Sequence, residues 1–358
     1  MTRSYFSRSV STLACAVVLS ACADSVSPTG PSSPDANLAA RGQQDRLSAW
    51  FTQASPAVLA LPGAVFADND ERVGKLVFGV ENAAAIPGIR VALTRLGIPT
   101  SAYDVQVTER IHQLATLRDV FRPTQAGIQI HFGRFLCTMG FNASQGGERS
   151  FVTNSHCTNR QGGVEGTEYF QPSSGVDGTV IAVEAEDPDY FRGGICPVGK
   201  RCRFSDASRA VYSASVASNQ GDILKTTGVN NGSVTVDGVF TIVSQDNATT
   251  SFPIGTEVNK VGRTTGWTQG EVTRTCVHTA VFASNIAQLC QTFVVNPAGA
   301  RVVGAGDSGS GVFRIAGGNR VQLVGILWGG SSDNRTFVFS PLKQIQDELG
   351  PLAATATK

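Results

Sequence analysis

The stretch Gly306-Asp307-Ser308-Gly309-Ser310-Gly311 places a serine between glycines, immediately before the strand-like run Val312-Phe313-Arg314-Ile315. Earlier, Phe151-Val152-Thr153-Asn154-Ser155-His156-Cys157 places a histidine at the end of another expected strand, beside a cysteine. A serine hydroxyl is a poor nucleophile unless a base lies within hydrogen-bond reach. Glycines allow backbone N–H groups to point at one spot, where a negatively charged oxygen would sit. Each motif alone also fits a plain turn or a structural role, so the surrounding chain must decide between these interpretations.

Both motifs belong to a long series of short strands that begins near Thr124. Turn residues separate the strands, and Asp237-Gly238 has the composition of a two-residue hairpin turn. A short C-terminal helix is expected over 343–349, with Ser340 as its N-cap and Pro341 at its first position. The expected strands are 127–132, 135–142, 150–153, 179–184, 233–244, 257–261, 270–282, 291–295, 311–315, 321–327 and 336–339. This pattern predicts an all-β double sheet or barrel over residues 124–349, followed by a tail over 350–358.

Residues 45–123 show a different, mixed pattern, which predicts a small α+β segment. Residues 46–51 open an amphipathic helix, and residues 107–121 place apolar side chains at three- and four-residue spacings, as on one face of a second helix. Between them, residues 75–80 and 89–93 have the composition of strands.

The first 22 residues have the pattern of an export signal, because Arg3 and Arg8 precede an apolar run over 10–19 that is too short to span a membrane. Leu19-Ser20-Ala21-Cys22 resembles a bacterial lipobox, in which the Cys22 thiol is acylated and becomes the first residue. Ordinary cleavage after Ala21-Cys22-Ala23 is the alternative. Residues 23–44 are expected to be a flexible linker. Either cleavage predicts an exported protein, held in the cell envelope (periplasm or outer surface) or secreted.

Composition narrows the function classes. With 29 basic and 28 acidic residues there is no basic surplus, so nucleic acid is not an expected partner. The low charge of 16% and the 39 glycines favour an exported all-β protein. No cofactor is expected.

Six cysteines remain beyond the signal, and an even number in an oxidising compartment predicts three disulfides. Of the possible pairings, chain order favours Cys137–Cys157, Cys196–Cys202 and Cys276–Cys290. A zinc site is the disfavoured alternative, because there is no Cys-x-x-Cys and there are only four histidines. No metal is therefore expected.

Taken together and in this order, the two motifs resemble those of the chymotrypsin-like serine proteases, and among them the secreted bacterial branch of streptogrisin and α-lytic protease type. Gly262-Arg263-Thr264-Thr265-Gly266-Trp267, Trp328-Gly329 and the terminal helix extend the resemblance over about 124–349. It implies a double six-stranded antiparallel β-barrel with a C-terminal helix and a site in the cleft between the barrels.

The resemblance implies Ser308 as the nucleophile, His156 as the base and a buried carboxylate that orients the imidazole. The N–H groups of Gly306 and Ser308 would form the oxyanion hole. Asp206 is the favoured carboxylate because it follows Phe204-Ser205 and precedes Ala207, a small-residue setting like that of the family. The alternatives are Asp187, Asp189 and Asp222, of which the first two lie in an acidic run that suggests a solvated turn.

Two departures from the family pattern concern residues around this site. Leu327 stands where many members have a serine that supports the aspartate, so that support must come from elsewhere. In trypsin-type members the equivalent of Asp307 pairs with a new N-terminus, but Gly127-Ile128-Gln129 does not match the usual start of such a chain.

The resemblance also implies a substrate pocket lined by Val302, Trp328, Gly329 and Gly330, which would accept apolar or small side chains. Arg301, if turned inward, would instead favour an acidic side chain.

Residues 45–123 fit a prosegment that assists folding and then inhibits, or alternatively a permanent accessory domain. The predicted function is that of an exported serine endopeptidase acting on protein or peptide substrates through an acyl-enzyme. The alternatives are an inactive binding protein of the same fold and an esterase of the same mechanism.

Overall fold

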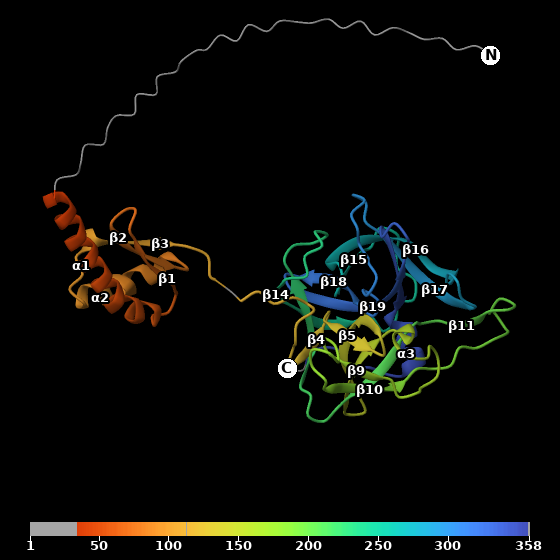
Figure 1. Ribbon diagram of the computed structural model, residues 1–358. Coiled ribbons are helices and arrows are strands. Elements are labelled where there is room, and N and C mark those ends of the chain that lie inside the picture. Colours follow the sequence, from red (N-terminus) through yellow and green to blue (C-terminus); the bar gives the residue numbers. More distant parts are fainter. Residues whose placement is uncertain (1–33, 112, 357–358) are drawn as a thin grey trace, which may run out of the picture. The chain divides into compact units, whose positions relative to one another are not determined.

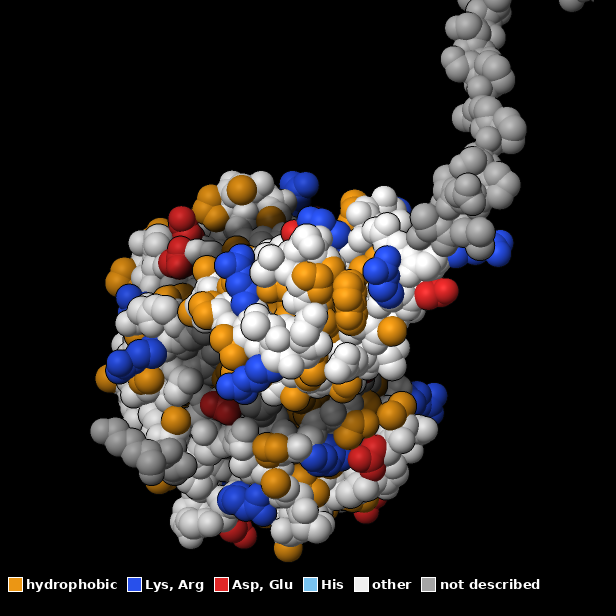
Figure 2. Space-filling view, turned by 90° about the vertical axis from the view of Figure 1, so that its left-hand side faces the viewer, with side chains coloured by type: hydrophobic (Ala, Val, Ile, Leu, Met, Phe, Trp, Pro, Cys, Tyr) orange, Lys and Arg blue, Asp and Glu red, His pale blue; other side chains and the backbone are white. Residues whose placement is uncertain are grey.

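The computed structural model describes residues 34–111 and 113–356, and it divides into two compact units at His112/Gln113 (Figure 1). The expected export signal, Cys22 and the first part of the linker lie outside the described residues. No helix among the described residues is long and apolar enough to cross a membrane. On the face shown in Figure 2, the described Lys and Arg side chains are scattered among acidic, apolar and uncharged ones.

The N-terminal unit is a three-stranded sheet with two helices. Strand β2 (Lys75–Val80) lies between β1 (Ala64–Asp70), which is antiparallel to it, and β3 (Tyr103–Val107), which is parallel to it. The helices are α1 (Pro34–Leu59) and α2 (Ile86–Arg95), and the short turns η1 (Ala83–Ala85) and η2 (Thr100–Ala102) join the elements. Their apolar faces share one core, which includes Leu47, Val58, Phe78, Ile89 and Leu93.

Three expectations for this region are wrong. Residues 89–93 lie in α2 and not in a strand, because Ile89 and Leu93, four residues apart, both face the core. Residues 34–44 of the expected linker are helical. Residues 108–111 and 113–115 have no regular structure, and Ile111 and Leu114 are exposed. An apolar stripe yields a stable helix only when packing buries it.

The first sheet of the C-terminal unit closes on itself. Its strand order is β6-β5-β9-β10-β12-β8-β7, and every pairing is antiparallel. The end strands β6 and β7 are separated in sequence only by Met139-Gly140, so they act as one bent strand that closes a six-stranded barrel. The strands are β5 (Gln129–Phe132), β6 (Phe135–Thr138), β7 (Phe141–Gln145), β8 (Glu148–Thr153), β9 (Glu168–Phe170), β10 (Val180–Glu186) and β12 (Ser208–Tyr212).

The second sheet contains another closed ring. In it β20 pairs with both β17 and β19, which completes the antiparallel cycle β17-β16-β15-β18-β19-β20. The remaining strands of this sheet are β4, β11, β13 and β14, and helix α3 follows β20. The bounds are β4 (Thr124–Ala126), β11 (Arg201–Arg203), β13 (Ser218–Thr226), β14 (Val236–Gln245), β15 (Glu257–Gly262), β16 (Gly266–Ala280), β17 (Ile286–Val295), β18 (Gly311–Gly317), β19 (Arg320–Gly330), β20 (Thr336–Pro341) and α3 (Leu342–Leu349). The double six-stranded barrel with a C-terminal helix is thereby confirmed.

Side-chain alternation along β19 shows how the barrels are filled. Leu323 belongs to the larger apolar cluster, whereas its neighbour Val324 belongs to a second cluster with Val258, Phe337 and Phe339. Successive residues of a strand point to opposite faces, so one strand contributes to both cores.

Two local expectations in this unit are also wrong. Strand β14 runs through Asp237-Gly238 without a hairpin; Gly238 has φ +117° and lies at a register shift against β13, which is a bulge. Ser340 does not cap α3, whose N-cap is Pro341 without a side-chain bond; the serine lies in β20 and uses its hydroxyl elsewhere. The three disulfides form as chain order favoured, Cys137–Cys157, Cys196–Cys202 and Cys276–Cys290.

Candidate active site

His156 lies in the short turn η3 (Ser155–Cys157), directly after β8. Its Nδ1 is 2.6 Å from Oδ2 of Asp206, and its backbone N–H donates to Oδ1 at 3.1 Å. Asp206 is almost completely buried, whereas the His156 side chain is 31% exposed. Burial alone would lower the pKa of His156, but the charge and hydrogen bond of Asp206 outweigh it and raise that pKa. Burial would likewise raise the pKa of Asp206, and the charge and hydrogen bond of His156 lower it instead.

The backbone of Asp206 is held from two sides. Its carbonyl accepts hydrogen bonds from Asn154 Nδ2 at 2.7 Å and from the Ser155 N–H at 3.3 Å, both beside the histidine. Its N–H donates to the Ser340 hydroxyl at 3.1 Å. Ser340 in turn donates to Gln291 Oε1, which also accepts from Trp328 Nε1 at 2.7 Å. Ser340 therefore holds the aspartate in this chain, where Leu327 has no hydroxyl to do so.

The other carboxylates do not contact His156. Asp222 accepts from Gln125, and Asp189 is exposed. Asp187 is 2% exposed, so the expectation of a solvated turn is wrong for it. It lies behind the histidine loop, where its Oδ2 accepts from the Ser155 hydroxyl and the Gly162 N–H, both at 2.9 Å.

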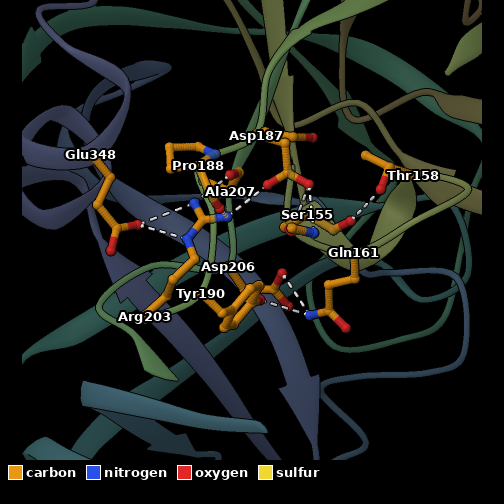
Figure 3. A network of polar contacts seen from close by, with 12 residues as sticks. Ser155, Thr158, Gln161, Asp187, Pro188, Tyr190, Arg203, Asp206, Ala207 and Glu348 are labelled. Carbon is orange, nitrogen blue, oxygen red and sulfur yellow. Dashed lines mark hydrogen bonds and ion pairs between the residues drawn. The ribbon is translucent and has the colours of Figure 1, made fainter. Parts of the chain in front are cut away.

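Arg203 is the centre of a buried polar network behind this loop (Figure 3). Its Nη1 is 2.6 Å from Asp187 Oδ1, and Nε and Nη2 are each 3.1 Å from Glu348 Oε2, on α3. The guanidinium lies over the ring of Tyr190, 5.2 Å from its centroid. A fully buried cation requires such partners, because an unpaired one would be strongly destabilising. The network connects α3 to the segment that carries Asp206.

Ser308 lies half-buried in the turn before β18. Its carbonyl accepts from the Thr138 N–H at 2.8 Å, and the following N–H, of Gly309, donates to Leu327 O at 2.9 Å. Gly309 has φ +93°, and a Cβ there would lie 2.2 Å from the Thr138 carbonyl oxygen, so only glycine fits.

The turn is tied to the histidine through a disulfide. Thr138 follows Cys137, which is bonded to Cys157 next to His156. The two sulfurs and a ring nitrogen of His156 lie within 4.8 Å of one another. Such a cluster could hold a metal only as free thiolates, and here the sulfurs are bonded to each other. Among the described contacts there is no direct hydrogen bond between the Ser308 hydroxyl and the His156 ring; such bonds often tighten only when substrate is bound.

Two backbone N–H groups are available beside Ser308. The carbonyl of Ala305 accepts from the Thr264 hydroxyl at 2.6 Å. Since the C=O and N–H of a planar trans peptide point in opposite directions, the Gly306 N–H points away from Thr264. Among the described residues, neither this N–H nor that of Ser308 has a hydrogen-bond partner. Gly306 has φ +94°, a conformation that favours glycine.

Asp307, next to the serine, is fully buried against Lys260. The Lys260 Nζ is 3.0 Å from Oδ2, which also accepts from the Thr265 hydroxyl and the Gly304 N–H. Burial lowers the pKa of Lys260, against the opposing effect of Asp307. Here an internal lysine supplies the charge that a new N-terminus supplies in trypsin-type chains.

The residues expected to line a substrate pocket lie on two neighbouring segments. Val302 is fully buried, and its backbone is held by Asn334 and by the Thr268 hydroxyl. A Cβ on Gly330 would lie 2.6 Å from Val303 Cγ1, whereas one on Gly329 would meet open space. Trp328 is half-buried beside them.

Arg301 does not turn inward. Its side chain is exposed and folds back so that Nε donates to Val303 O at 3.2 Å. The guanidinium also lies against the backbone of Gly304, where an added Cβ would be only 2.5 Å from the Arg301 Nη2.

Two closed antiparallel barrels with a C-terminal helix define the fold of the chymotrypsin-like serine proteases, and the C-terminal two-thirds of this chain is structurally similar to bacterial members of that class. One similar structure is Thermobifida fusca Protease A, with 20% identity and a TM-score of 0.44, covering 65% of this chain and 98% of that one. Nocardiopsis protease has 20% identity and a TM-score of 0.45, with coverage of 65% and 98%. A glutamic acid specific serine protease, described as using a novel histidine triad in substrate binding, has 24% identity and a TM-score of 0.44, with coverage of 64% and 100%. No family model and no curated protein matches the chain.

Sequence reasoning missed several residues around this site. Lys260 is one: its strand, Glu257-Val258-Asn259-Lys260-Val261-Gly262, mixes charged, polar and apolar residues, so the burial of the lysine had no local signal. Ser340, Gln291 and Arg203 had none either, because polar residues at those positions fit an exposed strand equally well.

Proposed function

We propose that this protein is an exported serine endopeptidase that uses Ser308, His156 and Asp206. The observation that carries the proposal is the 2.6 Å contact between His156 Nδ1 and the buried Asp206 Oδ2. An imidazole held in this way presents its other nitrogen as a base. The half-buried Ser308, with two unpaired N–H groups beside it, supports its assignment as the nucleophile.

In the proposed mechanism the Ser308 Oγ attacks the carbonyl carbon of the scissile bond while His156 Nε2 takes its proton. Asp206 stabilises the resulting imidazolium, and the N–H groups of Gly306 and Ser308 bind the oxyanion. His156 then gives the proton to the leaving amine, which leaves an acyl-enzyme on Ser308. A water molecule, deprotonated by His156, hydrolyses this ester and restores the serine.

We further propose that the pocket beside Val302 and Gly329 accepts apolar or small side chains. Val302 and Ile326 are apolar and fully buried, so neither of these positions supplies a carboxylate or an imidazole to pair with a charged substrate. The folded-back Arg301 supports the same conclusion. Trp328, Gly329 and Gly330 would bind the substrate backbone.

The N-terminal unit is proposed to be a prosegment that assists folding and inhibits until it is removed. The region 109–114, in which residues 109–111, 113 and 114 are exposed, is the proposed region of cleavage, since Leu117 is already buried in the core of the second unit. Export, and a lipid anchor on Cys22, remain proposals from the sequence; the three disulfides support an oxidising compartment.

The test is covalent labelling with a fluorophosphonate, followed by mass spectrometry of the labelled peptide. We expect modification of Ser308, its loss in Ser308→Ala, and unchanged labelling in Ser174→Ala, which alters an exposed serine. An unlabelled but folded protein would indicate a binding protein. Digestion of a peptide library then separates an endopeptidase from an esterase, which would cleave only matched esters.

A further inference from the structure

Two loops of the C-terminal unit form one projecting feature, here called the paired tip: residues 191–202, which lead into β11, and residues 281–285, which join β16 to β17. The Arg201 N–H donates to Asn285 O at 2.9 Å, and Lys200 Nζ donates to Ser284 O at 2.9 Å. Strand β11 also pairs in parallel with the start of β17. Figure 1 shows both loops on the same side of the unit.

Disulfides and backbone pairing hold both loops in shape. Cys196–Cys202 closes the first loop, and Phe191 and Cys202 exchange two backbone hydrogen bonds at its base. Cys276–Cys290 joins the two strands below the second loop. The backbone that carries the side chains of the tip is therefore held in place, which reduces the entropy that the loops lose on binding.

The tip exposes large apolar side chains to water. Phe282 is 97% exposed, Val198 is fully exposed and Ile195 is 60% exposed. All three lie in turns of the two loops. Several exposed apolar side chains on adjacent loops indicate an interaction surface.

The charged residues within the two loops are all basic, although the exposed Asp189 lies two residues before the first loop. Residues 191–202 contain Arg192, Lys200 and Arg201 and no acidic residue, and residues 272–306 contain no acidic residue either. Arg201 packs on the Tyr190 ring, which leaves the exposed Arg192 and the half-buried Lys200, whose ammonium keeps its charge while it donates to Ser284 O. The carboxylates of Asp347 and Glu348, near the base of the hairpin at Cys290, already pair with Lys343 and Arg203.

We infer that the paired tip docks the protein on an anionic lipid surface, with Phe282 and Val198 inserted among the headgroups and Arg192 and Lys200 against lipid phosphates. Fully exposed apolar side chains on turns, flanked by cations, fit a bilayer interface, where burial of apolar area and attraction to anionic lipid add together. This docking requires neither proteolysis nor acylation of Cys22.

The experiment measures flotation with vesicles of phosphatidylcholine alone or mixed with phosphatidylglycerol. The exported full chain is used in every arm with Cys22→Ser, which cannot be acylated, and Ser308→Ala, which prevents self-cleavage if the protein is a protease. We expect binding to the mixed vesicles that weakens with added salt. Phe282→Ser should weaken it by about tenfold or more, and Arg192→Gln by about fivefold. Val176→Ser, a matched control at a 69% exposed position outside the tip, should bind like the parent.

Three results would overturn the inference: no binding to mixed vesicles, equal binding by Phe282→Ser and its parent, or an equal loss in Val176→Ser. Light scattering without vesicles measures whether the protein forms dimers. If the parent is dimeric and Phe282→Ser is monomeric, the tip is a contact between two copies of this chain and not a lipid-binding surface. If the protein binds polyglutamate but not vesicles, and Phe282→Ser weakens that binding, the tip is a docking surface for an acidic protein. Because the catalytic serine is absent from every arm, failure here leaves the proposed protease function untouched.

Discussion

Lys260 and Asp307 form an ion pair with both side chains completely buried, their Nζ and Oδ2 atoms 3.0 Å apart. Asp307 precedes Ser308, and its carboxylate also binds the N–H groups of Gly304, Thr264 and Thr265. The pair therefore holds the backbone that carries the candidate nucleophile and the two free N–H groups.

Removing the lysine should destabilise the protein strongly. Lys260→Met leaves the Asp307 charge buried without its partner, and breaking such a pair costs about 3–5 kcal/mol. We expect a loss of this size in the free energy of unfolding, measured with urea. The double variant Lys260→Met/Asp307→Asn should recover part of it, because no buried charge remains. Additive losses in the double variant would show that the pair is not coupled.

Because Lys260 lies inside the chain, activity should not depend on a particular new N-terminus. Chains that begin at different residues between 108 and 114 should have the same kcat/KM within about twofold, unlike a zymogen whose terminus must reach the equivalent aspartate. A sharp dependence on one starting residue would contradict the role assigned to Lys260.

Ser308→Ala and His156→Ala should each remove nearly all turnover while thermal unfolding stays close to that of the parent. The two residues act as one unit, so the double variant should be little worse than either single variant. Cleavage at near-parent rates by either single variant would refute the assignment.

Asp206→Asn should lower kcat by about ten-thousand-fold at neutral pH, because the amide favours the wrong imidazole tautomer. Asp189→Asn is the matched control and should retain activity, since that side chain is exposed. The reverse pattern in steady-state kinetics would move the role to Asp189.

Asp187 should make stability depend on pH below neutrality. Burial raises its pKa to about 6, against the opposing effects of Arg203, Ser155 and Gly162. The folded state then holds this proton more tightly than the unfolded state, so the contribution of Asp187 is largest below about pH 4 and is lost as the pH rises through 6. We therefore compare the free energy of unfolding of the parent with that of Asp187→Asn. The value for the parent relative to the variant should fall by about 3 kcal/mol as the pH rises over this window. A difference that stays flat over this window would contradict the raised pKa of Asp187.

Peptides that differ only in the residue before the scissile bond should be cleaved best when it is Leu, Phe or Ala. A substrate cation buried beside Val302 without a partner would lose several kcal/mol, or about a hundredfold or more in kcat/KM. Arg301→Ala should change this ranking little, because its guanidinium faces the Val303 carbonyl. A preference for Glu that disappears in Arg301→Ala would show that the arginine does turn inward.

The strands and the two motifs could be predicted from sequence because their signals are local. Strand β20 contains the short apolar run Phe337-Val338-Phe339, and Ser308 stands out through its adjacent glycines. Where a local signal was ambiguous the prediction failed: of the apolar stripe expected over 107–121, Ile111 and Leu114 stay exposed while Leu117 is buried in the second unit, and Asp237-Gly238 suits a bulge as well as a hairpin.

What the sequence determined by itself was the class of fold and the motifs that contain His156 and Ser308; chain order only favoured the disulfide pairing that the structure then showed. Tertiary structure decided which carboxylate is buried against His156, that Asp187 is buried behind it, and that Lys260 faces Asp307. These outcomes depend on residues far apart in the chain, such as Ser340 and Asp206, which are 134 positions apart. Local composition sets the propensity of a segment, whereas burial and pairing follow only when the barrels close and bring such residues within a few ångströms.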